Sequence, residues 1–568
     1  MEFLTGQVAQ GCKLVAHYTR KWVAHYGCKC LVHYRCKLLV HYTLPNDTRY
    51  PYQDYLLYKR DEKTLPQEGE NKMFFKEKEF EKWRNFEDVE AIFLRDWVDV
   101  HLPVKSIDEE KGIVTFKKYS RRALFDGDRP GRYYIENAFE FLKYPGQWYL
   151  DRKNGVFYYL PAIREKNGKC EIIYPVLSEI LRLEGNPEED KFVKYINFRN
   201  LTFSHTNWEL SENDAGDYQA ANTVPGAIYA EGTQHCIFEG CSFSHLGNYG
   251  IELARGCKDN LISNCNILDL GAGGIRIGEF IGKEDVKKLQ KKPLAHTTSN
   301  RVINCHIYNG GNIFHQACGI LVGQSSGNLI SRNHIHGFFY TGISIGWTCG
   351  YGLSLARDNI VEYNHIHHIG LKLNGEGPIL SDMGGVYTLG IQPGTIIRHN
   401  LFHDLAGYRY GGWGIYFDEG STHIVAENNL VYNTTHGGFH QHYGKENIVR
   451  NNIFAYGRYC QLKISRPENH LRLIFERNIV IGRTGRFLDG NIDFNFKFNK
   501  NLYWKDEQGE IKFGDYSWEE WRNKGMDKNS LILDPLFINP KKYNFNLEKN
   551  SPAFKLGFKP IILARNEH

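Results

Sequence analysis

The sequence predicts an all-β protein whose main part is a right-handed parallel β-helix, and two repeating patterns carry that prediction. The first is a short unit of Asn or Cys, then any residue, then an aliphatic or aromatic residue. Its closest copies lie 23 or 24 residues apart, and such a period with one strand-turn unit per copy is typical of a solenoid. The unit begins at Cys241, Cys265, Cys305, Asn333, Asn364, Asn400, Asn429, Asn452, Asn478 and Asn501.

The second pattern is a set of short strands, each of which begins with glycine, alternates with period two and is rich in β-branched or aromatic residues. Three short strands per coil, with no segment of helix length, indicate a parallel β-helix whose coils stack about 4.8 Å apart. Stacked Asn side chains would then bond along the column, and Cys would fill the same slot as a small apolar group. These strands are Gly226–Tyr229, Gly250–Leu253, Gly274–Ile277, Gly319–Val322, Gly342–Ile345, Gly385–Thr388, Gly414–Phe417 and Gly438–Gln441.

Four regions follow from these patterns. Residues 47–165 are expected to form a small β-rich appendage, in which Asn154-Gly155 turns a hairpin between two aromatic strands. Residues 166–530 are predicted to be the β-helix that carries the site. Residues 531–568 are predicted to cap the last coil, because a solenoid must cover its open strand edge.

Residues 1–46 differ from the rest of the chain. His-Tyr recurs there every eight residues, and Lys and Cys follow the same period. We interpret this segment as non-native and disordered, the product of a short DNA repeat joined to a gene without its original start. Metal binding by the alternating Cys and His is the alternative. The His-Tyr pairs begin at His17, His25, His33 and His41.

Bulk properties exclude several classes of partner. The net charge of +5 is small for 568 residues and no basic stripe is present, so nucleic acid is not an expected partner. No apolar run could span a membrane and no signal peptide is visible, which predicts a cytoplasmic protein as encoded, or a secreted one if the original N-terminus is missing. The 13 cysteines lack paired spacing and are expected to be free thiols. The sequence does not fix the oligomeric state.

The candidate chemistry lies on consecutive coils. Asp382 and the pair Asp418-Glu419 are separated by one coil plus a loop and are flanked by glycines that leave room for a ligand. We predict Asp382 and Asp418 to be the catalytic pair of a sugar-hydrolysing site, since one carboxyl can donate a proton while the other activates water or attacks. The predicted substrate-binding residues are Glu419, His440, His442, Gln441, Trp413, Tyr387 and Tyr416.

The strand register decides the geometry of this pair. If Ile415 stacks on Phe439, Asp418 and His442 take equivalent positions on neighbouring coils. Asp382 would either stack directly on Asp418 or lie in the loop before its strand; the first register suggests a retaining mechanism and the second allows an inverting one. Neither a cofactor nor a metal is expected. Four other histidines are interpreted as turn residues: His336, His367, His368 and His403.

The motifs resemble family 141 of the glycoside hydrolases over about residues 47–557. The resemblance rests on Leu380–Thr388, Tyr416–Ser421 and Gly438–Gly444, and extends to the Pro145-Gly146 hairpin and the Asp534–Phe537 tail. It implies hydrolysis of plant cell-wall glycans, as by α-L-fucosidases or xylanases, with a carbohydrate as the binding partner and the aspartates at positions 382 and 418 as the catalytic pair. The chain departs from the family at its start, where the usual first coils are absent.

Two other functions remain open from the sequence. A polysaccharide lyase or uronate epimerase uses the same scaffold but needs a base and a group that neutralises the uronate, and the motifs contain no Lys or Arg beyond Lys445. A non-catalytic glycan-binding solenoid would fit the coil repeat. The concentration of acids, His and Trp between residues 376 and 444 argues against it.

Overall fold

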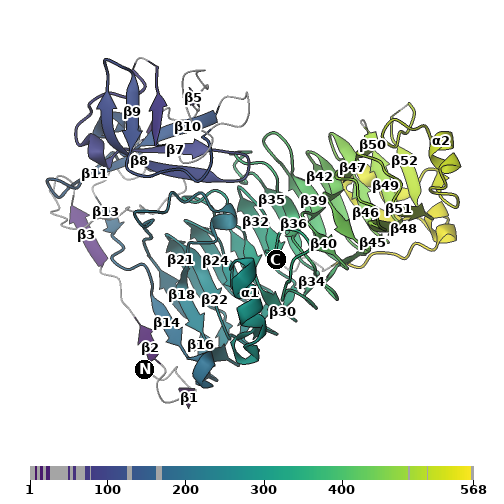
Figure 1. The fold of residues 1–568 in the computed structure, drawn as a ribbon, viewed down its shortest axis with the longest axis horizontal. Helices are drawn as coiled ribbons and strands as arrows, with labels where there is room; N and C mark the ends of the chain where they lie inside the picture. The colour runs from purple at the N-terminus through teal and green to yellow at the C-terminus, as the bar shows by residue number, and fades with distance from the viewer. Residues whose placement is uncertain are drawn as a thin grey trace.

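The computed structural model describes residues 7–8, 13–16, 21–25, 49–50, 56–58, 71–76, 78–124, 131–161, 169–483, 486–507 and 509–563. Its main body is a column of coils, and each regular coil adds one strand to each of three sheets (Figure 1). The neighbouring strands pair in parallel throughout the column. The predicted right-handed parallel β-helix is therefore confirmed.

Sheet 1, which carries the candidate site, runs from one end of the column to the other. Its first strand, β2, pairs antiparallel with β14, whereas the pairs that follow are parallel. Its strands are β2 (Lys13–Ala16), β14 (Leu181–Glu184), β18 (Gly226–Glu231), β22 (Tyr249–Leu253), β25 (Ile275–Ile277), β29 (Ile320–Val322), β33 (Ile343–Ile345), β36 (Gly384–Thr388), β39 (Trp413–Phe417), β43 (Gly437–Gln441), β47 (Cys460–Ile464) and β50 (Arg486–Gly490).

Sheets 2 and 3 complete each coil, and the repeating Asn or Cys lies at the turn between them. Sheet 2 contains β16 (Asn197–Arg199), β20 (Ile237–Glu239), β23 (Leu261–Ser263), β27 (Arg301–Ile303), β31 (Leu329–Ser331), β34 (Ile360–Glu362), β37 (Ile396–Arg398), β41 (Val425–Glu427), β45 (Asn447–Arg450), β48 (Leu473–Glu476) and β51 (Phe496–Asn499). Sheet 3 contains β17 (Thr202–Ser204), β21 (Ser242–Leu246), β24 (Asn266–Leu270), β28 (His306–Tyr308), β32 (His334–Phe338), β35 (His365–Ile369), β38 (Leu401–Leu405), β42 (Leu430–Thr434), β46 (Ile453–Ala455), β49 (Ile479–Gly482), β52 (Leu502–Lys505) and β53 (Leu531–Ile532).

The core fills the inside of the column because each strand alternates its side chains between the two faces of its sheet. Ile320, Ile343, Val386 and Ile415 follow one another in register and are completely buried. The next residue of each strand points outward. This alternation gives sheet 1 an outer row of side chains available for chemistry.

The predicted asparagine ladder is present and bonds in one direction. The backbone N–H of Asn364 donates to Oδ1 of Asn400 at 2.9 Å, and that of Asn400 donates to Oδ1 of Asn429 at 3.0 Å. Each Asn also donates its side-chain amide to a carbonyl of the preceding coil, as Asn400 does to Val361 at 2.9 Å. In the cysteine coils the Cys305 thiol lies 3.6 Å from the equivalent carbonyl. Cys therefore replaces Asn as a weak donor, and not only as the apolar filler predicted above.

An antiparallel domain precedes the column and lies beside it (Figure 1). Its sheet has the order β4-β10-β7-β8-β9-β6, with β5 paired to β10. The predicted hairpin is present as β11 (Trp148–Asp151) and β12 (Val156–Tyr159). The strands of the sheet are β4 (Arg49–Tyr50), β5 (Leu56–Tyr58), β6 (Lys72–Phe74), β7 (Glu90–Leu94), β8 (Asp99–Asp108), β9 (Ile113–Phe116) and β10 (Gly131–Glu136).

A buried polar cluster joins this domain to the column. Asp99 is completely buried and accepts bonds from the backbone N–H and Nδ1 of His315, at 2.8 and 2.6 Å. Burial by itself would raise the pKa of Asp99, but the charges and hydrogen bonds of His101 and His315 hold it well below its usual range. Burial opposes charge on His101 as well, yet Asp99 raises the pKa of His101 to about 9. Asp99 is therefore held in the charged form in which it accepts both bonds from His315 of the column, and His101 on the same strand supports that charge.

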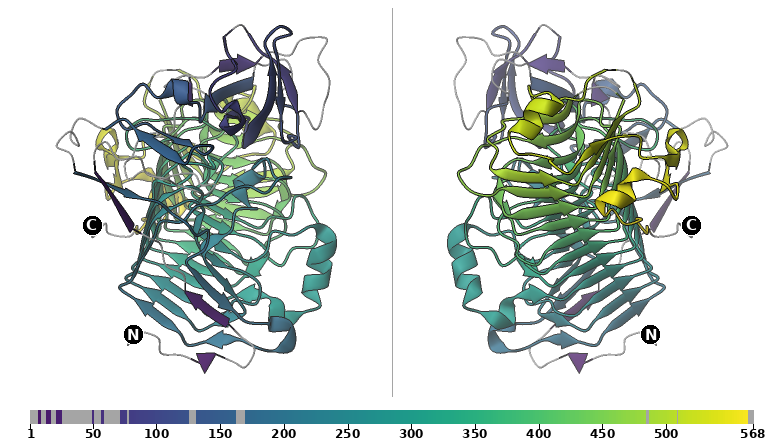
Figure 2. Two further views of the ribbon diagram at one scale, coloured as in Figure 1. Left: turned by 90° about the vertical axis from the view of Figure 1, so that its left-hand side faces the viewer. Right: turned by 90° about the vertical axis from the view of Figure 1, so that its right-hand side faces the viewer.

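The two ends of the column are covered differently (Figure 2). At the C-terminal end, α2 (Trp518–Asn523) places Trp521 on the last core aromatics, with ring centroids 5.9 Å from Phe496 and 4.9 Å from Phe513. The tail first adds β53 to sheet 3, and then β54 (Phe537–Asn539) and β55 (Asn544–Leu547) pack on the outside of that sheet.

At the N-terminal end, the described parts of residues 1–46 are β1 (Gln7–Val8), β2 and β3 (Lys21–His25), which pairs with β13 (Lys169–Ile173). The other residues of the octad segment, and most of the prediction made for it, lie outside the described residues. Within the described part of the chain, no helix is long and apolar enough to span a bilayer. Helix α1 (Lys283–Gln290) lies in an insertion between two coils.

Candidate functional site

The candidate site is built on the outer row of sheet 1, where Tyr387, Tyr416 and His440 stand in register on β36, β39 and β43. Their rings pack on one another: Tyr387 and Tyr416 are edge to face at 5.1 Å, and His440 stacks on Tyr416 at 4.6 Å. Trp413, the first residue of β39, has its ring centroid 4.6 Å from that of Tyr416 and 4.3 Å from that of His440. The result is an aromatic platform of four rings.

Asp382 lies in the loop before β36, in the left-handed conformation with φ of 57°. The register Gly384↔Trp413 and Val386↔Ile415 confirms the looped arrangement and shows that direct stacking of the two aspartates was wrong. The backbone N–H of Asp382 donates to the carbonyl of Tyr410 at 3.1 Å. Gly411 must be glycine here, since a Cβ would approach the Asp382 nitrogen to 2.6 Å.

Asp418 follows the last residue of β39. Ile415 pairs with Phe439 as predicted, so Asp418 and His442 occupy equivalent positions on adjacent coils. The hydroxyl of Tyr387 donates to Oδ2 of Asp418 at 2.5 Å, and the hydroxyl of Tyr416 donates to Oδ1 of Asp382 at 3.0 Å. Each carboxyl is therefore held by the hydroxyl of one tyrosine of the platform.

The two aspartates differ in how readily they ionise. Burial raises the pKa of Asp382 well above its usual range, and the negative charge of Asp418 raises it further. Burial also raises the pKa of Asp418, but hydrogen bonds from Tyr387 and Tyr416 and the neighbouring His442 oppose that rise. The surroundings of Asp382 thus favour the protonated form more strongly than those of Asp418.

His440 and Trp413 pack against the ring of Tyr416 and are almost completely buried. His440 is 3% exposed and its Nε2 bonds Oγ of Ser465 at 2.6 Å. Burial lowers the pKa of His440 well below its usual range, which keeps the ring neutral. Trp413 is 2% exposed, so its face is covered by neighbouring protein atoms.

Gln441 is the one predicted contact that the structure places elsewhere. It is aligned with Phe417 on the inner side of sheet 1, and its amide donates to the carbonyls of Gly444 and Arg472 at 3.3 Å. The period of two along β43 sends His440 outward and Gln441 inward. Gln441 therefore holds a turn in place and does not reach a ligand.

Glu419 and His442 are partly exposed beyond the end of the platform. The Glu419 carbonyl accepts from the backbone N–H of Gly350 at 3.1 Å, which fastens the 347–358 insertion across the coils. Tyr351 of that insertion donates to the Glu468 carboxylate at 2.6 Å. The insertion thus lies beside Glu419, the residue that follows Asp418.

Several site residues were not predicted. Asp96, in the turn between β7 and β8, accepts from the backbone N–H of Ser381 at 2.5 Å, and its charge contributes to the raised pKa of Asp382. Gln219 donates to the hydroxyls of Tyr340 and Tyr387 at 2.8 and 3.2 Å. Asp96 and Ser381 are nearly 300 positions apart in the chain, so no local sequence pattern could have predicted their contact.

Comparisons with known proteins agree with the fold. A family model described as "Right handed beta helix region" matches residues 185–280 and 294–480. A solved structure titled "Glycoside hydrolase" is similar over 79% of this chain and 82% of its own, with 20% identity and a TM-score of 0.57. A complex of XylC with xylose (12% identity, 79% of this chain and 68% of that one, TM-score 0.36) and a GH136 lacto-N-biosidase from Eubacterium ramulus (13% identity, 51% of each chain, TM-score 0.35) are more distant.

The curated proteins contain no match. Fold and family model together define the class: the chain is a right-handed parallel β-helix protein. At 20% identity the likeness to the glycoside hydrolase concerns the fold alone.

Proposed function

We propose that this protein is a glycoside hydrolase in which Asp382 is the general acid and Asp418 the base or nucleophile. The observation that carries the proposal is a pair of buried carboxyls, each bonded by a tyrosine hydroxyl of the platform, whose pKa values are raised to different extents. Two carboxyls whose environments separate their pKa values are the usual arrangement for acid and base roles in glycoside hydrolysis.

The chemistry follows from the position of the proton. Asp382 protonates the glycosidic oxygen as the bond to the anomeric carbon breaks, and the Asp418 carboxylate either attacks that carbon or removes a proton from water. Tyr387 orients the Asp418 carboxylate through its hydrogen bond, and Tyr416 orients the Asp382 carboxyl in the same way. The resemblance to family 141 of the glycoside hydrolases supports plant cell-wall glycans as the substrate class, and the structural neighbour titled "Glycoside hydrolase" is in keeping with it.

The experiment is a reducing-sugar and product-mass screen on plant cell-wall glycans with the full chain, Asp382→Asn and Asp418→Asn. Asn tolerates the left-handed backbone of position 382, so the substitution removes the acid and retains the loop. Asp259→Asn is the matched control, because Asp259 has a φ of 54° and is exposed in the turn before β23 of sheet 2. We expect losses of about 10²–10⁴-fold for the two site variants and none for the control.

Other outcomes would refute the proposal. Release of products that carry an unsaturated uronate would identify a lyase. Glycan binding that survives both substitutions, without any product from the parent, would identify a binding solenoid.

A further inference from the structure

The outer face of sheet 3 carries a ladder of histidines that the proposed hydrolysis does not use. Three of them form one column in register, His306, His334 and His365, on β28, β32 and β35. A second column lies two residues further along the same strands and continues on β38 and β42. His336, His367 and His403 of this column therefore lie in strands, and their prediction as turn residues was wrong. The second column is Tyr308, His336, His367, His403 and Tyr432.

Rings within each column stack as the coils stack. His306, His334 and His365 are nearly parallel, with centroids 4.6 and 4.8 Å apart. The second column stacks in the same way, at 4.8 Å from His336 to His367. Each column is therefore held rigidly by the sheet beneath it, at the spacing of the strands.

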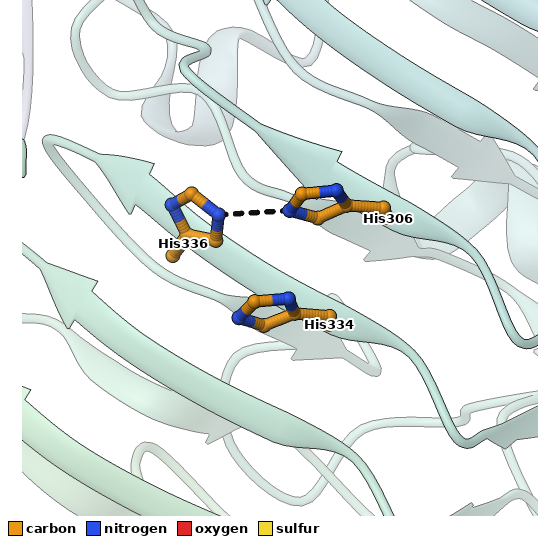
Figure 3. Close-up of side chains that lie close together, drawn as sticks. All are labelled: His306, His334 and His336. Carbon is orange, nitrogen blue, oxygen red and sulfur yellow. Dashed lines mark hydrogen bonds between the residues drawn. The ribbon is translucent and has the colours of Figure 1, made fainter. Parts of the chain in front are cut away.

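The two columns also face each other through ring nitrogens. Nε2 of His306 lies 2.9 Å from Nε2 of His336 (Figure 3), and Nε2 of His334 lies 2.7 Å from Nε2 of His367. One nitrogen of each such pair must carry the proton and the other accept it. Within the described part of the chain, Nδ1 of His336 is buried without a hydrogen-bond partner.

These contacts gather ligand atoms into two overlapping triads. One nitrogen from each of His306, His334 and His336 lies within 4.8 Å of the others, and the same holds for His334, His365 and His367. Each triad takes two residues from one strand and the third from the preceding strand. His306, His334 and His365 are partly exposed, so an ion can reach the nitrogens from solvent.

We propose that this ladder binds one late first-row transition ion, of the Zn²⁺ class, through three imidazoles of one triad. Three imidazoles and a water complete the tetrahedral set that Zn²⁺ favours, and imidazole suits Zn²⁺, Cu²⁺ and Ni²⁺ over Ca²⁺ or Mg²⁺. Because both triads use His334, they cannot be filled together, and the stoichiometry is one ion. The ion bridges two coils.

The electrostatics of the ladder agree with this geometry. Burial, together with the neighbouring imidazoles, lowers the pKa of His336 and of His365 to about 3 each. Neutral rings keep a lone pair for a metal at neutral pH. The site is separate from the aspartate pair, which stands on sheet 1.

The test is titration of the chelator-treated full chain with Zn²⁺ by calorimetry, and with Co²⁺ by visible absorption. The octad segment contains Cys12, Cys28, Cys30 and Cys36, together with His17, His25, His33 and His41, which are alternative ligands. A cobalt spectrum without a thiolate charge-transfer band excludes these cysteines, and the variants below separate the ladder from the octad histidines. A thiolate band on the bound ion would overturn the proposal.

Variants locate the ion. His334→Gln removes a ligand from both triads and should lower affinity by more than the 10–100-fold, roughly, that follows loss of an outer-shell partner. The double variant His336→Gln/His367→Gln retains His334 and should lose binding equally, which keeps the test decisive if His334→Gln does not fold. Each single variant of that pair leaves one triad and should still bind one ion.

His423→Gln is the matched control, since His423 lies in an exposed pair with Glu446 outside the ladder. It should bind Zn²⁺ like the parent, as should Asp418→Asn. The melting temperature should rise with Zn²⁺ in the parent and stay unchanged in His334→Gln. Parent-like affinity in a folded His334→Gln, or no binding by the parent, would refute the proposal.

Discussion

Replacing Asn400 by alanine should remove about 4 kcal/mol of stability. Asn400 is fully buried, and its side chain takes part in four hydrogen bonds. Oδ1 accepts from the backbone and side-chain N–H groups of Asn364, both at 2.9 Å, and Nδ2 donates to Val361 O at 2.9 Å and to Asn429 Oδ1 at 3.0 Å. At a net value of about 1 kcal/mol for each bond, their sum gives the expected loss.

The assay is equilibrium urea unfolding followed by far-ultraviolet circular dichroism, with unchanged m-values as the condition for comparison. Asn374→Ala is the control, because Asn374 is exposed in a loop and should change stability by less than about 0.5 kcal/mol. Asn400→Cys should recover about 1 kcal/mol of the loss, since the thiol can donate to Val361 O as Cys305 does to the equivalent carbonyl. An alanine variant no less stable than the Asn374 control would show that the ladder does not support the turns.

Three further predictions concern the site, the domain contact and the cap. Tyr387→Phe removes a donor that favours the charged form of Asp418, so the pKa of Asp418 should rise and the acidic limb of the activity–pH profile should move to higher pH. His101 has a folded pKa of about 9, above its unfolded value, so its contribution to folded-state stability is complete below about pH 6.5 and is lost as the pH rises through 9. Proteolysis of the N-terminal domain should therefore accelerate as the pH rises through that interval in the parent, and Asp99→Asn should lose this pH dependence. Trp521→Ala deletes a fully buried ring and its bond to Asp527, and should lower unfolding stability by about 3–5 kcal/mol in the same urea assay, while an unchanged midpoint would show that α2 is not a cap.

The period of the ladder allowed the fold to be predicted, because stacked coils must repeat their turn residue. A second ladder of Asn260, Asn300, Asn328 and Asn359, which stands before the strands of sheet 2, was missed. Each of its members lies five residues before a member of the first ladder, so the signal was present in the sequence. The uneven coil lengths concealed it, since loops of differing size separate one Asn pair from the next.

The candidate site was predictable only where strand register determines it. The neighbours of Asp418 follow from pairing on adjacent coils, and His442 was placed correctly. Side chains alternate along β43, so the side chain of Gln441 points into the column. The same alternation, applied to the sequence, would have removed Gln441 from the predicted substrate contacts. The position of Asp96 beside Ser381 depends on how a separate domain packs, and long-range docking of this kind leaves no spacing pattern in the chain.

The backbone N–H groups of the asparagine ladder donate to the coil that follows, so each turn is completed only when the next coil has been made. Each turn offers its N–H to the coil that follows it, so a chain made from its N-terminus carries one incomplete turn at its growing end until the next coil is synthesised. The series stops only where Ser530 accepts the N–H of Asn501 at 2.8 Å. A chain whose translation stops at an earlier coil would expose unpaired strand edges that can associate with other chains. The last forty residues are therefore needed to complete the final turn.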